Sequence, residues 1–255
     1  MPLEALDLAI LVAAALATSI LSAVVGMAGG IVLLSVMLLY LEPLAAIPLH
    51  GVIQLVSNGS RAIIQRRHVD WALTWRYALL LLPAGAVGMP VAYALSPPVT
   101  RSLIGAFVLA ATWRPGWLML GTHPEDARPK LRFFALGGVT GFLMVVIGAT
   151  GPLIAPFFLN LGLTRQALIG TKAACQMLGH TAKLVLFGFA GFAFLDWAGP
   201  LAAMCAAVIA GTWLGSRLLE RVNERMFTLL FKSVLTAVAL RLVIWEGWKL
   251  LAPVL

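Results

Sequence analysis

Two rows of polar side chains cross segments that are otherwise apolar, and their residue types limit the chemistry they can perform. In each row the later members follow the first one by four, seven, eight and eleven positions, and this spacing places the row on one face of a helix. The rows contain cations, amides and imidazoles but no carboxylate, the ligand that a hard cation prefers. They therefore predict contact with an anion, and no metal ion or cofactor is expected. The first row is His50, Gln54, Ser57, Asn58 and Arg61, and the second is Lys172, Gln176, Gly179, His180 and Lys183.

The polar rows should face the interior of the protein, because a polar group at membrane depth is costly unless it meets a cavity or a partner. Other roles stay open for single residues. Gln54, Asn58 and Gln176 could hold helices together by hydrogen bonds. Arg61 could extend to the membrane surface. His180 could carry a coupling proton near neutral pH or serve as a hydrogen-bonded fixture.

Two glycine-rich breaks, GMAGG at 26–30 and GATGP at 148–152, precede apolar segments of only about twelve residues, 30–41 and 152–163. Twelve residues make about 18 Å of helix, against a hydrocarbon core of about 30 Å. Short interrupted segments in equivalent places mark transporter binding sites, since a restarting helix points free N–H groups at an anion. Whether these segments span the membrane or re-enter it stays open, and the glycines could instead permit tight helix crossing. The candidate anion contacts here are Gly26, Gly29, Gly30, Gly148, Thr150 and Gly151.

Arg114 and Arg241 form a further pair of candidates. Each is placed inside the last apolar segment of its half, and Pro115 is expected to kink the first of these segments. Anchoring at the membrane surface is the favoured role. Completing the surroundings of the anion is the alternative.

The composition indicates that lipid surrounds most of the chain. Apolar residues make up 61% of the 255 residues and charged residues 11%, with a mean hydropathy of +0.98, whereas soluble domains are about 45–50% apolar. We expect an all-α integral membrane protein with about eight to ten crossings. The first apolar run is expected to be a retained span, because acidic Glu4 and Asp7 precede it where a signal peptide would be basic.

Several function classes are disfavoured. The net charge of +8 is explained by basic residues at the edges of apolar runs, so no nucleic-acid partner is expected. No HExxH, GxSxG or Walker motif is present, and an enzyme is not expected. Cys175 and Cys205 lie in apolar stretches without a CxxC spacing and are predicted to be unpaired.

The apolar segments fall into two groups of five on either side of one long polar stretch. That stretch, GTHPEDARPKLR at 121–132, contains two prolines and five charged residues and is predicted to be a loop. The predicted units are a first membrane repeat at 1–120, a connecting loop at 121–131 and a second membrane repeat at 132–255. The segments are 8–25, 30–41, 43–64, 72–95 and 98–120, then 132–148, 152–163, 165–191, 197–219 and 226–251.

The two groups are related by a nearly constant offset. At offset 122 the matches are Gly26 to Gly148, Gly29 to Gly151, Gln54 to Gln176, Asn58 to His180 and Arg61 to Lys183. Asp70-Trp71 matches Asp196-Trp197 at offset 126, and Gly88 matches Gly215 and Arg114 matches Arg241 at offset 127. Matches in order at such offsets predict an internal repeat.

Basic residues then predict how the repeats are oriented, because they mark cytoplasmic loops. The basic connection of the first half, with Arg66, Arg67 and His68, has a counterpart at 189–196 without a basic residue. The connection that holds only Arg101 has a counterpart with Arg217, Arg221 and Arg225. Equivalent loops on opposite faces predict inverted-topology repeats, with both termini outside and the central loop (Arg128, Lys130, Arg132) in the cytoplasm.

The run at 148–192, from GATGPLIAPFF to LFGFAGF, resembles the second-half signature of the TauE/SafE sulfite exporter family. The shared features are the glycine-rich break, Pro156 a few residues on, and the Gly170–Thr171 pair that enters a long helix. In the first half GMAGG, HVDW at 68–71 and PAGAVG at 83–88 resemble the amino-terminal repeat. GMAGG departs from the usual GxGGG, and no proline matches Pro156. The resemblance covers about residues 8–250.

This resemblance implies a multi-pass exporter of sulfite, organosulfonates or similar anions in the inner cell membrane, without ATP hydrolysis and coupled to a proton or another ion gradient. The expected partners are the anion, the coupling ion and the lipid bilayer, and the oligomeric state stays open. Two other functions also stay open. One is an anion channel, and the other is a membrane-embedded enzyme or assembly factor that uses His180 and Cys175.

Overall fold

The computed structural model describes residues 3–25, 29–119, 129–158, 161–218 and 224–251, and this part of the chain is helical without a strand. The first half contains α1 (Ala5–Val25), α2 (Gly29–Tyr40), α3 (Pro43–Ile64), α4 (Trp71–Ala78), α5 (Leu81–Ala94), α6 (Pro97–Trp113) and the 3₁₀ turn η1 (Pro115–Met119). The second half contains α7 (Pro129–Val146), α8 (Gly151–Ile154), η2 (Ala155–Phe158), α9 (Arg165–Phe189), η3 (Phe194–Trp197), α10 (Ala198–Leu218) and α11 (Glu224–Leu251).

The outer surface of the helices is apolar, which confirms the predicted all-α membrane protein. Among the described residues, the stretches Ala5–Ser22, Trp71–Ala94 and Phe194–Gly215 are long and apolar enough to cross a bilayer. Phe189 and Leu195 are almost fully exposed. Side chains of this kind on the outside are stable only against lipid or another apolar surface.

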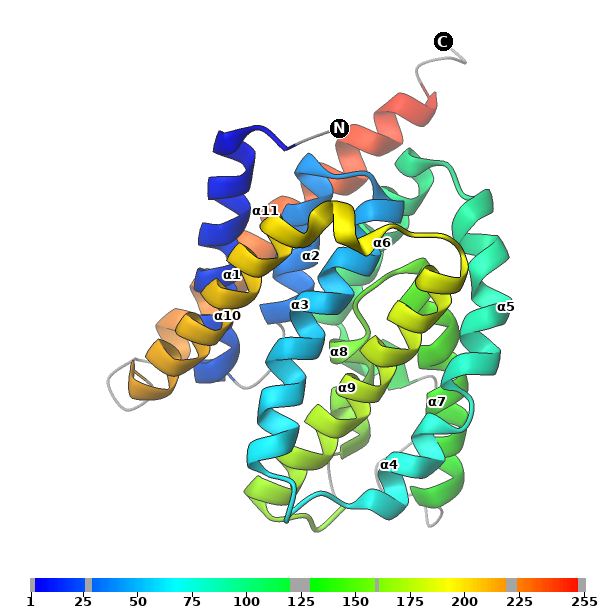
Figure 1. The fold of residues 1–255 in the computed structure, drawn as a ribbon, viewed down its shortest axis with the longest axis vertical. Helices are drawn as coiled ribbons and strands as arrows, with labels where there is room; N and C mark the ends of the chain where they lie inside the picture. The colour runs from blue at the N-terminus through cyan, green and yellow to red at the C-terminus, as the bar shows by residue number, and fades with distance from the viewer. Residues whose placement is uncertain (1–2, 26–28, 120–128, 159–160, 219–223, 252–255) are drawn as a thin grey trace.

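Helices α3 and α9 cross at the centre of the molecule and run antiparallel (Figure 1). Their register follows from the close approach at three glycines. A Cβ at Gly51 would lie 3.1 Å from Leu184, one at Gly59 would lie 3.9 Å from Met177, and one at Gly170 would lie 2.8 Å from Gln65. Position 51 is therefore level with position 184, and position 65 with position 170.

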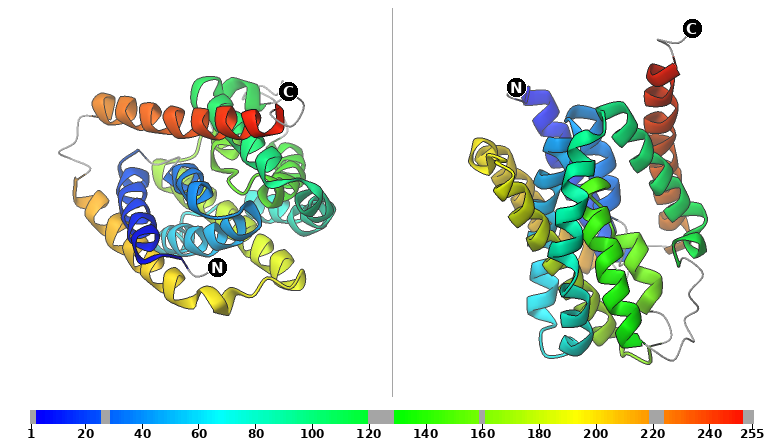
Figure 2. Two further views of the ribbon diagram at one scale, coloured as in Figure 1. Left: turned by 90° about the horizontal axis from the view of Figure 1, so that it is seen from above. Right: turned by 90° about the vertical axis from the view of Figure 1, so that its right-hand side faces the viewer.

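The remaining helices surround this crossing in packed pairs. Helix α1 packs against α10, α7 packs against α5, and α6 packs against α11 on another side (Figures 1 and 2). The start of α1 and the end of α11 lie at the same end of the molecule.

Arg101 of α6 connects several elements at the end of the molecule where α1 starts. Its guanidinium donates to the carbonyls of Leu38 and Leu41 at 3.1 and 3.2 Å, and it forms an ion pair with Glu42 at 3.1 Å. Glu246 of α11 is buried and lies 3.9 Å from the same guanidinium. The contact therefore joins the end of α2 to a helix of the second half.

The predicted segment 72–95 is divided into α4 and α5 at Leu79–Leu80. Pro83 explains the division, because its ring lacks an N–H and clashes with the carbonyl four residues earlier, at Leu79. The predicted apolar segment therefore consists of two consecutive helices. The two pieces together still provide the span Trp71–Ala94.

The segment 98–120 also ends earlier than predicted. Helix α6 stops at Trp113, and Arg114 is its C-cap with φ −135° and ψ 56°. A residue before proline is disfavoured in the α conformation, so Pro115 ends the helix instead of kinking it. Arg114 therefore lies at the end of the helix and not inside it, which corrects its predicted position.

The second short segment, predicted at 152–163, contains much less helix than the first. Helix α8 has four residues and is followed by the four-residue 3₁₀ turn η2, whereas α2 has twelve residues. Pro152 is tolerated in the first turn, but Pro156 removes a backbone donor where an α-helix would need one. The expectation of two equal helices is wrong, and neither segment is long enough to span the membrane alone.

The predicted connecting loop is shorter than 121–131, because α7 already begins at Pro129. Arg132 was expected in a cytoplasmic loop. It is instead buried, with Nη2 donating to the carbonyl of Phe157 at 3.1 Å and its guanidinium 5.9 Å from the ring of Phe157. Arg128 and Gly26, which were also named from the sequence, lie outside the described residues.

The packing of α4 against α7 generates a stability prediction. A Cβ at Gly137 would collide with the backbone carbonyl of Tyr77, so Gly137→Ala should lower the free energy of unfolding by about 1–3 kcal/mol. Gly199→Ala is the control, because nothing lies within 4 Å of a Cβ at that position. Thermal unfolding in detergent measures both variants, and equal stability of the two would contradict the packing described here.

Candidate functional site

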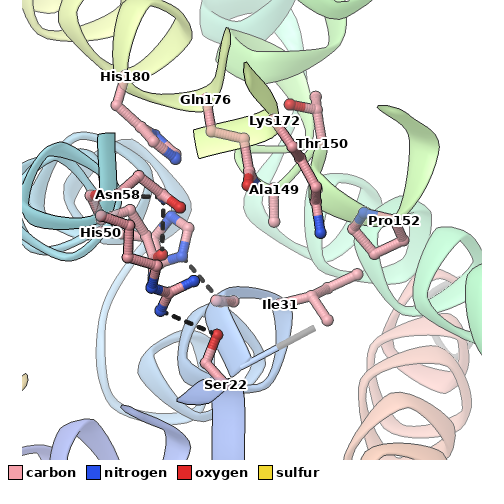
Figure 3. Close-up of a pocket in the computed structure, with 14 residues that line it drawn as sticks. Ser22, Ile31, His50, Asn58, Ala149, Thr150, Pro152, Lys172, Gln176 and His180 are labelled. Carbon is pink, nitrogen blue, oxygen red and sulfur yellow. Dashed lines mark hydrogen bonds between the residues drawn. The ribbon is translucent and has the colours of Figure 1, made fainter. Parts of the chain in front are cut away.

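A small polar cavity lies where α3 and α9 cross, beside the starts of α2 and α8 (Figure 3). Its volume is about 30 Å³, which is room for one or two water molecules. Lys172, Gln176 and His180 of α9 point into the same space as Asn58 of α3. The lining residues are Ser22, Gly30, Ile31, His50, Gln54, Asn58, Arg61, Ala149, Thr150, Gly151, Pro152, Lys172, Gln176 and His180.

One face of α3 supplies the first side of the cavity. His50, Gln54, Asn58 and Arg61 line it at intervals of four, four and three residues, as the helical period requires. Asn58 is held by its own helix, because its Nδ2 donates to the carbonyl of Gln54 at 3.0 Å and to Oε1 of Gln54 at 3.3 Å. Ser57 is buried beside this face but does not line the cavity.

Arg61 turns toward the cavity and does not extend to the surface. Its Nη2 donates to the hydroxyl of Ser57 at 3.0 Å and to that of Ser22, at the end of α1, at 3.2 Å. Both partners are neutral. A cation with two hydroxyl partners keeps an uncompensated positive charge that an anion could meet.

Helix α9 supplies the opposite side with Lys172, Gln176 and His180. The ring centroids of His180 and His50 lie 5.8 Å apart in an edge-to-face arrangement. His180 is 7% exposed, and its Nδ1 has no hydrogen-bond partner among the described residues. An unsatisfied buried polar atom at a cavity wall is costly and calls for a ligand or water.

The start of α9 is fixed against the turn after α3, and this places Lys172. Thr171 Oγ1 accepts a hydrogen bond from the backbone N–H of Asp70 at 2.9 Å. Gly170 allows the two segments to touch, since a Cβ there would lie 2.8 Å from Cβ of Gln65. The Gly-Thr pair therefore docks α9 so that the next residue faces the cavity.

Each half brings a glutamine against the start of its own short helix. A Cβ at Gly30 would lie 2.9 Å from the amide carbon of Gln54, and a Cβ at Gly151 would lie 2.8 Å from Nε2 of Gln176. These two glycines keep backbone and amide in contact at the cavity wall. Gly29 does not line the cavity, and its lack of a side chain lets α2 pass the carbonyl of Thr18 in α1.

Gly148 and Lys183 meet at the break between α7 and α8. Gly148 has a φ of +87°, a left-handed conformation that favours glycine. Its carbonyl accepts a hydrogen bond from Nζ of Lys183 at 2.6 Å, and the carbonyl of Ile47 accepts a second one at 3.4 Å. Lys183 is fully buried behind the cavity and does not line it.

The two breaks differ in what they offer an anion. Helix α2 begins at the cavity and is long enough to present a positive end there. Helix α8 is a single turn, so its dipole is small. The helix end predicted after Gly151 is therefore shorter than the one after Gly30, and its contact with an anion stays a prediction.

The structure separates Arg114 and Arg241 from the cavity. Arg114 is exposed at the end of α6, with its guanidinium 5.9 Å from the ring of Trp117. Arg241 is exposed on α11. These positions agree with the favoured anchoring role.

Ser22, Ile31, Ala149 and Pro152 line the cavity but were not predicted. Ala149 and Pro152 lie inside the GATGP break, so their backbone could have been included with their neighbours. Ser22 lies one helical turn before the first break, so its closeness to that break was a weak indication that it could line the cavity. Nothing in the sequence around Ile31 distinguishes it from other apolar residues.

The described residues that line the cavity include arginine, lysine and histidine side chains but no aspartate or glutamate. No cluster of His, Cys, Asp or Glu among the described residues could hold a metal ion. Cys175 is buried without lining the cavity, so His180 and Cys175 do not share a site. The cavity therefore suits an anion with several hydrogen-bond acceptors.

A helical, lipid-exposed fold with a polar cavity deep between its two halves defines a multi-pass membrane protein of the transport type. The chain belongs to the sulfite exporter TauE/SafE family, whose model matches residues 11–242. No curated protein and no solved structure matches the chain.

The cavity generates a binding prediction. Arg61→Met and Lys172→Met should each weaken sulfite binding about tenfold or more, because a charge-assisted hydrogen bond contributes about 1.5–3 kcal/mol. Sulfite-dependent thermal stabilisation of the purified protein measures this.

Arg114→Met and Arg241→Met are the matched controls, since both residues are exposed away from the cavity. Equal losses in all four variants would show a general charge effect and no specific site.

Proposed function

We propose that the protein exports a small sulfur-containing anion, with sulfite as the favoured substrate, and that export is coupled to an ion gradient. The observation that carries this proposal is the cavity at the α3–α9 crossing. It brings cationic and amide side chains together without a carboxylate among its described lining residues. Family membership supports the same class of substrate.

Arg61 and Lys172 would provide the charge that attracts the anion. Gln54, Asn58 and Gln176 offer amide N–H groups, and these can hydrogen-bond oxyanion oxygens without repelling a second negative charge. The backbone at Gly30, Thr150 and Gly151 would complete the contacts. Nδ1 of His180 and Nδ1 of His50 have no hydrogen-bond partner among the described residues, and both residues line the cavity.

Sulfite is favoured over an organosulfonate because the cavity is small, with a volume of about 30 Å³. An organosulfonate adds a carbon chain to the same charged group. It would demand a larger opening of a tightly packed crossing.

Transport would proceed by alternating access, with one half moving against the other around the anion. The antiparallel packing of α3 and α9 supports this proposal, because these two helices are equivalents in the predicted repeat. Antiparallel equivalents are what inverted repeats require. A channel would instead need a continuous path, and the cavity is small and bounded by the buried His50.

The end at which α3 stops is proposed to face the cytoplasm. Exposed Arg66, Arg67 and Lys130 gather there, near α4 and the start of α7. Glu4, Asp7 and Glu42 lie at the opposite end, with the start of α1. Basic residues on the inside then place both termini outside.

The function predicts sulfite flux into proteoliposomes. Uptake of labelled sulfite should saturate and should be driven uphill by a pH gradient or another ion gradient. Labelled methanesulfonate should be carried more slowly. Arg241→Met should transport like the unchanged protein, because Arg241 is exposed on α11.

Absence of flux for every sulfur-containing anion tested would overturn the proposed function. Flux that does not saturate and only follows the anion's own gradient would identify a channel. Cys175→Ser should have a modest effect, and loss of all activity in that variant would favour the enzyme or assembly factor.

The orientation predicts the result of cysteine labelling in a variant that lacks Cys175 and Cys205. In intact cells, Glu42→Cys should react with a membrane-impermeant maleimide, whereas Arg67→Cys should react only after the cells are opened. Both positions are exposed. The reverse pattern would place the termini inside.

A further inference from the structure

The α3–α9 crossing holds basic side chains at two levels. Residues 50 and 61 of α3 are separated by eleven residues, and so are residues 172 and 183 of α9, which is about 16 Å along each helix. Because the helices are antiparallel with position 51 level with 184 and position 65 level with 170, Arg61 shares one level with Lys172. His50 shares the other level with Lys183.

The Arg61–Lys172 level is accessible from the cavity. Both residues line it, and Arg61 is held by two hydroxyls, each of which is a neutral and replaceable partner. The amides of Gln54, Asn58 and Gln176 follow between the two levels. An anion that entered at this level would meet a second positive level further along the same crossing.

The His50–Lys183 level is closed by backbone carbonyls. Lys183 is fully buried, with Nζ bonded to the carbonyls of Gly148 and Ile47 at 2.6 and 3.4 Å. His50 is 1% exposed, and its Nε2 donates to the carbonyl of Gly30 at 2.8 Å. Two of these three carbonyls belong to the helix breaks.

A carbonyl dipole is a weaker partner for a buried cation than an anion is, because two opposite unit charges attract each other strongly where the dielectric constant is low. Burial at membrane depth makes this difference larger. An anion that reached Lys183 would therefore displace the carbonyl of Gly148. Gly148 has a φ of +87°, so release of its carbonyl would alter the break itself.

We propose that Lys183 and His50 form a second anion-binding station, closed in this conformation by the carbonyls of Gly148, Ile47 and Gly30. The anion passes to it from Arg61 and Lys172. This inference rests on the proposed function and assigns the order in which the anion meets its contacts. Exchange of carbonyl for anion at Lys183 links the position of the anion to the conformation of the break between α7 and α8.

The internal repeat gives an independent reason for two stations. Offset 122 takes His50 to Lys172 and Arg61 to Lys183, so each station contains one residue of each equivalent pair. If the two halves of the predicted repeat exchange conformations during transport, the two stations exchange their surroundings. The station that is open to the cavity in this conformation is then closed in the opposite conformation, and the closed station is open.

The test separates binding from transport. Lys183→Met should keep sulfite binding in detergent within about threefold of the unchanged protein, because the first station is intact. It should lower sulfite flux in proteoliposomes at least twentyfold. Arg61→Met should lose binding and flux together, and Arg241→Met, exposed on α11, should lose neither.

His50→Leu removes the hydrogen bond to Gly30 and the ring contact with His180, and it should lower flux more than it lowers binding. It is the second variant to use if Lys183→Met does not fold, as judged by size-exclusion chromatography and thermal unfolding. Lys183→Arg should restore part of the flux, since it returns the charge.

Normal flux in Lys183→Met would overturn the second station, and so would a loss of binding as large as in Arg61→Met. Absence of flux in the unchanged protein is a different result, because it rejects the proposed function itself.

Discussion

A cation buried at membrane depth must meet either an opposing charge or a set of oriented dipoles. The α3–α9 crossing uses dipoles. Lys183 is fully buried and is held by the carbonyls of Gly148 and Ile47, while Arg61 is held by the hydroxyls of Ser22 and Ser57. These neutral partners stabilise the positive charges without cancelling them. In the proposed function, the remaining positive potential attracts the anion to the centre of the protein.

The broken helices follow from the same constraint. An intact helix uses its own carbonyls in the i to i−4 pattern, so few are left for a lysine on a neighbouring helix. The break at Gly148 frees a carbonyl for Lys183, and α2 restarts beside the cavity with Gly30 against Gln54. The glycines permit both contacts, one by its left-handed φ and the other by leaving room for the glutamine amide.

Much of the site followed from the sequence because helical periodicity is a local property. Four members of the first row and three of the second line one cavity, and the all-α membrane fold and its family are confirmed. The members that line it are His50, Gln54, Asn58, Arg61, Lys172, Gln176 and His180. The differences between the predicted segments and the observed helices also have local causes, which are prolines. Pro156 shortens α8, Pro115 ends α6 before Arg114, and Pro83 divides α4 from α5, each through a missing N–H or a steric clash.

The sequence by itself determined which residues share a helix face, where the chain breaks and that lipid surrounds the helices, because these depend on composition and on spacing along one segment. Only the tertiary structure decided that Lys183 lies behind the cavity while Arg61 lines it, and that Ser22 joins the wall. Equal spacing along two helices does not reveal their register. The register depends on the glycine contacts between α3 and α9, which form only when residues far apart in the chain are packed together.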